Sequence, residues 1–389
     1  MILNIIIILS SLITIAYCLL MVAYTIGWLK QKEFLLPTNF EPKIFISIII
    51  PARNEEENIA ACINSILAQK YPVSLFEILI VDDHSTDNTV EIVENFNKDN
   101  IHCFSLANYI KGGETSSYKK AALAAGISEC KGELIITTDA DCTAPNSWLL
   151  HIAAYYQSNN PTMIIAPVNY ASNNNLVQTF QVIDFITMQG ITAATHALKS
   201  GNMSNGANLA FTKAAFMQID GYEGVDNFAS GDDYLLMLKM SNLPDSKIAY
   251  LKSAKAMVVT QPQPDWHSFL QQRIRWASKS GKYDDKKLNA ILILVYVFNL
   301  MFALLFISGI WCNQLLVTAV TLLIIKILAE LLLLIPVASF FKKEWLLGYF
   351  PFLQPLHILY IIVAGFLGYA GNYEWKGRKI IRQKNLAQQ

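Results

Sequence analysis

Long apolar segments at both ends of the chain restrict its fold more than any other feature. Residues 2–28 are almost wholly apolar, and so is most of 288–371. About 20 consecutive apolar residues are enough for a helix to cross a bilayer. We therefore expect an N-terminal transmembrane anchor over residues 1–29 and a C-terminal transmembrane region over 288–371. These segments account for a hydrophobic content of 53%, which exceeds the share usual in soluble domains.

The charges beside the first apolar segment predict its orientation. Lys30 and Lys32 follow the segment directly, whereas no Lys or Arg precedes it and no small-residue cleavage site is evident. Because basic flanks favour the cytoplasmic side, we expect residue 30 onward to lie in the cytoplasm. The chain is thus predicted to be an integral protein of the plasma (inner) membrane with a cytoplasmic middle domain.

The C-terminal region contains two clear spans, 288–311 and 314–338, and a third segment, 345–371, that is harder to interpret. Pro351 and Pro355 are expected to interrupt its first half, since proline ends or kinks helices. The alternatives are a third span or a re-entrant piece. A re-entrant piece would keep the basic tail, 372–389, in the cytoplasm.

Lys326 and Glu330 lie four residues apart in the second span and share one helical face. We expect them to form an internal ion pair between packed helices, with a role in an acceptor path as the alternative.

Residues 38–287 have the composition of a soluble domain and alternate strands with helices. Ile44–Ile50 form a continuous apolar run typical of a buried parallel strand, and further runs end at Val81 and Thr138. Helical spacing of apolar residues separates these runs, with Asp83 or Ser85 expected to cap a helix starting near residue 86. The pattern predicts a doubly wound α/β domain.

Polar residues follow each predicted strand, in the groups 53–55, 82–85 and 139–141. Ligands of doubly wound domains bind at the carboxyl ends of their strands, so three polar groups on one edge indicate a site. Asp139 and Asp141, one residue apart, would repel each other without a cation between them. Hard oxygen ligands favour Mg²⁺ or Mn²⁺, which complete their shells with phosphate oxygens.

Several other classes of protein lose support. The chain lacks a GxGxxG after the first strand and a GxxxxGK[ST] anywhere, so the dinucleotide and P-loop motifs are missing. Its formal net charge of +0 argues against a nucleic-acid partner. The six cysteines form no CxxC pair, which favours free thiols in a reducing compartment.

The segments "IIIPARNEEENI", "ILIVDDHSTDNT", "DAD", "SNGANLAF", "GDDYLL" and "QQRIRW" occur in this order. Together they resemble the family 2 glycosyltransferases, in particular the membrane-bound branch of polysaccharide synthases and ceramide glucosyltransferase. The resemblance covers about residues 44–280. It implies a GT-A (Rossmann-like) fold and an inverting hexosyl transfer from a nucleotide-diphosphate sugar to a lipid or growing polysaccharide of the cell envelope, with partner subunits possible for export.

The resemblance also assigns residues on the donor side. Asp83 would bind the nucleobase, helped by the first-loop residues Pro51, Arg53 and Glu55. Asp139 would contact the ribose or the metal, Asp141 would be the direct metal ligand, and Lys119 would lie near the nucleotide. The chain departs from the family in having Tyr118 and Ala124 where Gly and Asn are usual.

On the acceptor side, the family's second acid maps to Asp233, which would be the general base, with Asp232 in place of the usual Glu. The alternative is that both acids only cap the following helix. Gln272, Arg275 and Trp276 share a helical face. In the family these positions serve the leaving diphosphate and the acceptor sugar. The alternative is an interfacial helix over about 265–283.

Two rival functions use the same features. A catalytically silent membrane scaffold would keep the fold but does not need the base, the metal pair and the Arg–Trp pair together. A transporter would need ionisable residues distributed through the spans, and the spans contain only Lys326 and Glu330.

Overall fold

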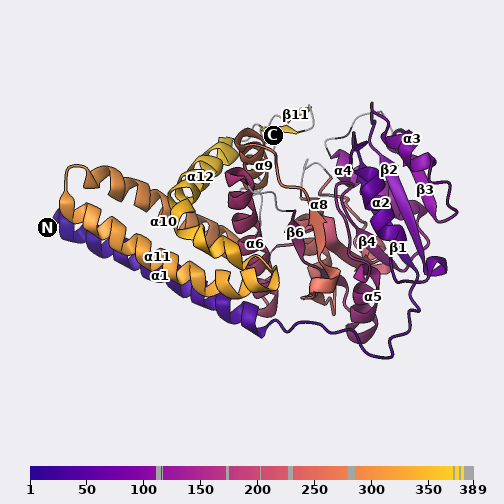
Figure 1. Cartoon of the computed structure of the whole chain (residues 1–389), viewed down its shortest axis with the longest axis horizontal. Helices are drawn as coiled ribbons and strands as arrows, with labels where there is room; N and C mark the ends of the chain where they lie inside the picture. Colours follow the sequence, from indigo (N-terminus) through magenta and orange to yellow (C-terminus); the bar gives the residue numbers. More distant parts are fainter. Residues whose placement is uncertain are drawn as a thin grey trace, which may run out of the picture. The chain divides into compact units, whose positions relative to one another are not determined.

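The structure is a computed structural model of the whole chain (Figure 1). It describes the chain except for residues 111–114, 116, 172–174, 202, 227–230, 279–284, 371–372, 376–377 and 381–389, and gives the backbone alone for the remaining residues after 368. The chain divides into two compact units. The first comprises Met1–Leu29, Ser172–Ala194 and Pro262–Gln389, and the second comprises Lys30–Ala171 and Thr195–Gln261.

A seven-stranded sheet with the order β3-β2-β1-β4-β7-β5-β8 forms the centre of the second unit. Its strands are β1 (Ile46–Ala52), β2 (Phe76–Asp82), β3 (Ile101–Ser105), β4 (Leu134–Thr137), β5 (Met163–Ile165), β7 (Leu209–Thr212) and β8 (Ile248–Tyr250). Strand β1 pairs in parallel with both β2 and β4, whereas β7 is antiparallel to its neighbours β4 and β5. A two-stranded sheet joins β6 (Val168–Tyr170) to β9 (Val258–Thr260).

The apolar runs form strands because the sheet is buried. Every residue of β2 is buried, and Ile48, Ile49 and Ile50 of β1 are fully inaccessible. Helix α4 (Tyr118–Glu129) packs on β1 and β2. The unit's other helices are α2 (Ile59–Leu67), α3 (Thr89–Glu94), α5 (Trp148–Asn159), α7 (Lys213–Gln218) and α8 (Asp232–Ser241). The predicted α/β fold is confirmed, with a sheet that is mainly parallel and in which β7 runs antiparallel to its neighbours.

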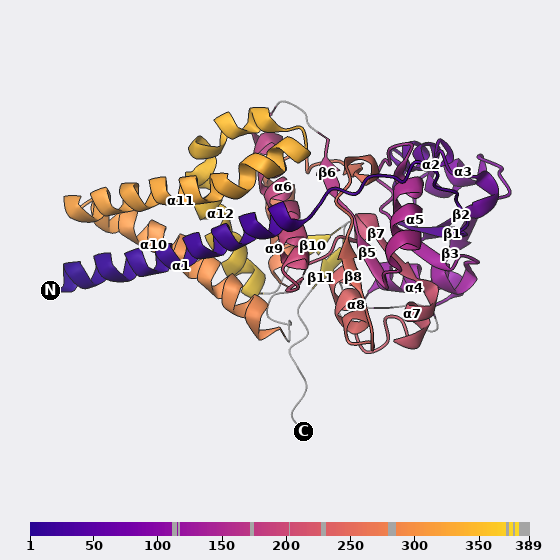
Figure 2. The same cartoon turned by 90° about the horizontal axis from the view of Figure 1, so that it is seen from below.

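Among the described residues of the first unit, four helices are long and apolar enough to cross a membrane (Figure 2). They are α1 (Ile2–Lys30), α10 (Lys286–Gly309), α11 (Asn313–Phe340) and α12 (Phe350–Ala370), of which Phe350–Gly368 is the candidate span. The unit also contains α6 (Leu176–Ala197, of which the last three residues belong to the second unit) and α9 (Trp266–Ala277). Helix α9 packs against α12, and α10 packs against α11 and α12.

Helix α12 continues through both prolines, so they do not interrupt the segment as the sequence suggests. Pro351 lies in the first turn, where backbone N–H groups have no partner within the helix. Pro355 then removes one hydrogen bond early in the helix. The preceding residues, Glu344–Gly348, form a short 3₁₀ helix.

A closed polar ring joins three of the long helices. Lys326 of α11 donates to Glu330 Oε1 at 2.7 Å and to the side-chain oxygen of Gln354 on α12. Gln354 Nε2 donates to Glu330 Oε2 at 2.9 Å, and the Tyr17 hydroxyl of α1 donates to Glu330 Oε1. The predicted Lys326–Glu330 ion pair is therefore present, and each of its buried charged groups is hydrogen-bonded.

Candidate active site

Three neighbouring parallel strands bring the predicted donor-side residues to one edge of the sheet. Strand β1 lies between β2 and β4, and it runs parallel to both. The residues that follow these strands therefore lie at the same edge. The chain order also reverses between β1 and β4, which makes this edge a topological switch point, where open α/β sheets bind their ligands.

Arg53, after β1, and Asp83, after β2, are in contact. Arg53 Nη1 donates to the Asp83 backbone oxygen at 2.8 Å and lies 3.8 Å from Asp83 Oδ1. Asp83 is buried, and His84 Nδ1 lies 3.0 Å from the same Oδ1. The first two loops are thus joined at the residues predicted to hold the nucleobase, with Pro51 just upstream in β1.

Side chains outside the prediction link these two loops further. Asn54, whose φ of 50° lies in the left-handed region, accepts from Thr86 N at 2.8 Å through Oδ1. Glu55 N donates to Thr89 Oγ1 at 2.8 Å. Helix α3 begins at Thr89, whose backbone N–H is bound by Asp87 rather than by Asp83 or Ser85. The predicted cap is therefore wrong, because Asp83 is engaged with the first loop.

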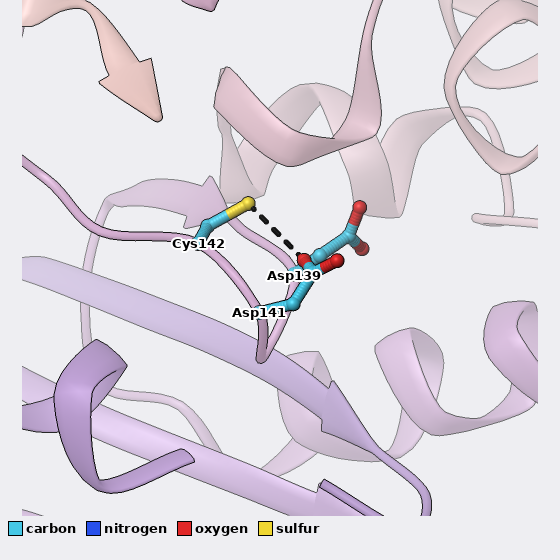
Figure 3. A group of neighbouring side chains, drawn as sticks. All are labelled: Asp139, Asp141 and Cys142. Atoms are coloured by element: carbon cyan, nitrogen blue, oxygen red, sulfur yellow. Dashed lines mark hydrogen bonds between the residues drawn. The ribbon is translucent and has the colours of Figure 1, made fainter. Parts of the chain in front are cut away.

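The loop after β4 carries the candidate metal ligands. Side-chain ligand atoms of Asp139, Asp141 and Cys142 lie within 4.8 Å of one another. Figure 3 shows Cys142 turned toward Asp141, to which its Sγ donates at 3.5 Å. Burial raises the pKa of Cys142, and the carboxylates of Asp141 and Asp139 raise it further, so this thiol stays protonated.

Asp141 shows that the site fits a divalent cation. Burial, followed by the charges of Asp139 and Glu55, raises the pKa of Asp141 to about 6. A carboxylate whose charge is disfavoured in this way gains most from a cation bound beside it. The two aspartates would offer the hard oxygen ligands that Mg²⁺ and Mn²⁺ prefer.

Lys119 connects the metal-ligand candidates to the acid pair. Its Nζ lies 2.6 Å from Asp139 Oδ1 and 3.2 Å from Asp232 Oδ2. Burial opposes the charge of Lys119, but the carboxylates of Asp139 and Asp232 outweigh this effect and raise its pKa. Lys119 is therefore cationic, and Tyr118 before it does not keep it from the site.

Asp232 and Asp233 occupy the first turn of α8 but have different partners. Asp232 faces Lys119, whereas Asp233 Oδ1 accepts from the Tyr234 backbone N–H at 2.7 Å. Both acids are favoured at the positive end of the helix dipole. The contact of Asp233 with the Tyr234 N–H agrees with the alternative that the acids only cap the helix. The contact of Asp232 with Lys119 lies outside the helix and goes beyond that alternative.

Gly206 allows the backbone of the 3₁₀ helix Gly206–Asn208 to approach the acid pair closely. A Cβ at this position would lie 2.9 Å from Asp232 Oδ2 and 3.5 Å from Lys119 Nζ. The Gly206 carbonyl accepts from Thr137 Oγ1 at the end of β4, at 2.8 Å. The nearby Asn208 is fully buried, and its amide bonds Trp148, Pro167 and Ala256, so it supports the fold.

Gln272, Arg275 and Trp276 lie on α9, in the first compact unit. Gln272 Oε1 accepts from Arg273 Nη1 at 2.9 Å, and the Arg273 guanidinium carbon lies 4.2 Å from the centre of the Trp276 ring. Arg273 also pairs with Asp184 of α6 at 2.7 Å. Sequence analysis missed Asp184 and Arg273, although an acid within the largely apolar segment 176–197 was a visible signal.

The sheet order and the carboxylates at its switch point define a protein of the GT-A glycosyltransferase fold. The family described as "Glycosyl transferase family group 2" matches residues 134–367, well over half of the chain, and "Glycosyl transferase family 2" matches residues 47–211. The chain therefore belongs to the family 2 glycosyltransferases. The resemblance stated from the sequence motifs is confirmed.

Two curated relatives illustrate the similarity. Glycosyltransferase AglE of Haloferax volcanii is 38% identical over 107 residues, which are 27% of this chain and 33% of that protein. Poly-beta-1,6-N-acetyl-D-glucosamine synthase of Staphylococcus epidermidis is 25% identical over 258 residues, 64% of this chain and 59% of the relative. The chain thus spans about a third to three fifths of the length of these relatives.

A solved structure supports the fold over almost the whole chain. The mannosyltransferase PcManGT from Pyrobaculum calidifontis, in complex with GDP-Man and Mn²⁺, superposes with a TM-score of 0.58 at 18% identity. The match covers 95% of this chain and 99% of that one. At this identity the similarity shows the fold alone, and that fold is GT-A.

Proposed function

We propose that this protein transfers a hexose from a nucleotide-diphosphate sugar to a membrane-associated acceptor, with inversion at the anomeric carbon. One observation carries the proposal: Lys119 bridges Asp139 and Asp232, so a candidate metal carboxylate and the acid next to the candidate base Asp233 lie in one cluster. The cluster adjoins the switch-point edge, where such sheets bind nucleotides.

In the proposed reaction the acceptor hydroxyl oxygen attacks the anomeric carbon while the bond from that carbon to the diphosphate breaks. Asp233 takes the hydroxyl proton, and the nucleoside diphosphate leaves. Asp232, held by Lys119, lies beside Asp233 in the first turn of α8. Asp139 and Asp141 would hold a divalent cation, which, when bound, neutralises charge on the leaving diphosphate.

The donor's nucleoside would lie against the first two loops. The contact between Arg53 and Asp83 supports this position, and Glu55 and Pro51 belong to the same edge. The GDP-Man and Mn²⁺ bound to PcManGT support a nucleotide-sugar donor and a divalent cation. The proposed cation is Mg²⁺ or Mn²⁺.

We propose a lipid as the acceptor, with a growing polysaccharide as the alternative. The polar side chains of Lys326, Glu330 and Gln354 pair with one another rather than lining a path for a polymer. Relatives support both classes: one is named a dolichyl-phosphate beta-glucosyltransferase, from Trichomonas vaginalis, and another is the poly-N-acetylglucosamine synthase. A polysaccharide product would call for partner subunits that aid export.

The membrane arrangement proposed from the sequence accompanies this function. Residues 1–29 would anchor the chain, 38–287 would form the catalytic domain at the cytoplasmic face of the plasma (inner) membrane, and 288–371 would return to the bilayer. The four long apolar helices support membrane insertion. Gln272, Arg275 and Trp276, on a helix after the catalytic residues, would serve the acceptor and the leaving diphosphate.

The test uses membranes that contain the full-length protein, incubated with radiolabelled UDP-glucose, UDP-N-acetylglucosamine and GDP-mannose. Label is then counted in lipid and polymer fractions. Asp233→Asn is expected to lower the transfer rate by about 10²- to 10⁴-fold, the usual contribution of a general base. Asp245→Asn is the matched control, since Asp245 is exposed and has a left-handed φ of 58° that Asn also tolerates.

Transfer by Asp233→Asn at the wild-type rate would refute the assignment of the base. A wild-type protein that transfers none of the three sugars would instead favour the silent scaffold. Label in a long polymer rather than in lipid would refute the lipid acceptor.

A further inference from the structure

Arg273 contacts two of the three acceptor-side residues without being one of them. Its Nη1 donates to Gln272 Oε1 at 2.9 Å. Its guanidinium carbon lies 4.2 Å from the centre of the Trp276 ring and 4.7 Å from that of Phe269. The guanidinium thus fixes the amide of Gln272 and packs against the indole plane of Trp276.

Asp184 of α6 holds Arg273 in this position. Arg273 Nε and Nη2 lie 3.0 and 2.7 Å from Asp184 Oδ2. The side chains of Arg273 and Asp184 are only 3% and 6% exposed. On its other oxygen, Asp184 accepts from the hydroxyl of Tyr360 on α12 at 3.2 Å. One buried carboxylate therefore joins α6, α9 and α12.

The three side-chain nitrogen atoms of Arg273 have two different partners. Nε and Nη2 face the acid, while Nη1 faces Gln272. The planar guanidinium of an arginine can bond Asp184 and Gln272 at the same time. A lysine would keep the charge facing Asp184 but would lose the hydrogen bond to Gln272. Breaking a buried pair leaves an uncompensated charge, so the geometry is held strongly.

We propose that the Asp184–Arg273 pair is a positioning device that orients Gln272 and Trp276 for sugar transfer. This inference rests on the proposed function and adds two residues to its acceptor side. Neither residue would touch the substrate. Both would act through the side chains of Gln272 and Trp276.

The experiment measures kcat and the donor KM of purified full-length protein in detergent, with the labelled sugar nucleotide that the wild type uses and an extract of membrane lipids. Arg273→Met is expected to lower kcat by about 10- to 100-fold, the range for losing charge-assisted hydrogen bonds, with the donor KM changed less than about twofold. Arg273→Lys is expected to recover part of the stability but little of kcat.

A second buried pair of the same unit provides the control. Lys326 and Glu330 are 0% and 8% exposed and lie outside the proposed site. The double variant Lys326→Met/Glu330→Gln is expected to change the melting temperature but leave kcat within about twofold of wild type, since it alters packing and not Gln272 or Trp276. A loss of kcat in this control as large as that in Arg273→Met would show a general packing effect and overturn the positioning role.

Tyr360→Phe keeps the test valid if Arg273→Met does not fold. This variant removes only the hydroxyl that bonds Asp184, and it is expected to lower kcat by about 3- to 10-fold. Wild-type kcat in a folded Arg273→Met, or in both Arg273→Lys and Tyr360→Phe, would refute the positioning role alone. A wild-type protein without transfer would refute the proposed function, and the inference with it.

Discussion

Replacing Asp141 by Asn should stabilise the protein while it destroys metal-dependent activity. The physical reason is the pKa of Asp141, which burial and the neighbouring carboxylates of Asp139 and Glu55 raise from 3.8 to about 6. A raised pKa means that the folded protein disfavours the ionised carboxylate. The free energy of unfolding therefore falls as the pH rises from about 3.8 to about 6, and the loss is complete at neutral pH.

The magnitude follows from this difference in pKa. At 1.36 kcal/mol per pKa unit, the rise from 3.8 to 6 corresponds to about 3 kcal/mol at pH 7, and about half of that at pH 5. Partial exposure of Asp141 makes this an upper value. Asn has nearly the same shape without the charge, so Asp141→Asn should recover up to this amount. A gain of several degrees in melting temperature follows for a unit of this size.

The assay is thermal unfolding of the full-length protein in detergent with EDTA, at pH 5 and pH 7. Asp141→Asn should melt above wild type at pH 7, and the difference should shrink at pH 5. Saturating Mn²⁺ should then stabilise wild type, by about 2.7 kcal/mol at 100 times the dissociation constant, but not the variant. Asp139→Asn is the control of opposite sign, because Asp139 is paired with Lys119 at 2.6 Å and its loss should lower the melting temperature. A lower melting temperature for Asp141→Asn in EDTA at pH 7 would refute the reasoning.

Three further predictions concern the same cluster. Below about pH 6 a cation must displace the proton of Asp141, so the apparent affinity for Mn²⁺ in transfer assays should fall about tenfold for each pH unit below that value. An apparent affinity that does not change between pH 5 and pH 7 would contradict this. Lys119→Met leaves Asp139 and Asp232 without their shared cation and should lower kcat by at least about tenfold, whereas Lys247→Met, at an exposed lysine, should not. Gly206→Ala places a Cβ 2.9 Å from Asp232 Oδ2 and should lower the free energy of unfolding by about 1–3 kcal/mol. The variant should therefore have a lower melting temperature and a lower kcat than wild type. Unchanged values would show that Asp232 can move aside.

Local sequence patterns were sufficient to predict the first half of the sheet. Ile46–Ala52 and Phe76–Asp82 are continuous apolar runs because parallel strands are buried on both faces, and polar residues begin where each strand leaves the core. The later half was not predictable in this way. Strand Leu209–Thr212 inserts between two strands that precede it by some 45 to 75 residues, and four-residue strands carry little periodicity.

In the candidate site, too, the residues that follow strands were predictable and the contacts between distant segments were not. Asp139, Asp141 and Asp83 were predicted because each directly follows a strand. The bridging position of Lys119 and the partnership of Arg273 with Asp184 depend on contacts between distant segments. No spacing rule connects such residues, since the fold alone brings them within reach. The prolines of α12 were over-interpreted: Pro351 lies in the first turn and costs no helical hydrogen bond, and the helix continues past Pro355 with the loss of one.

The two like charges at the end of β4 can coexist because they have different partners. Asp139 is balanced by Lys119, whereas Asp141 lies in the field of Asp139 and Glu55, which makes its charge costly. In the proposed function, a sugar nucleotide would bring two further negative charges on its diphosphate, and these carboxylates would repel it. A dication held by Asp141 would relieve both costs at once, so cation and donor would each favour the binding of the other, by the same factor in both directions. The proposed catalytic cluster would therefore disfavour its own empty state, and the free energy released on filling it would be available to hold the leaving diphosphate.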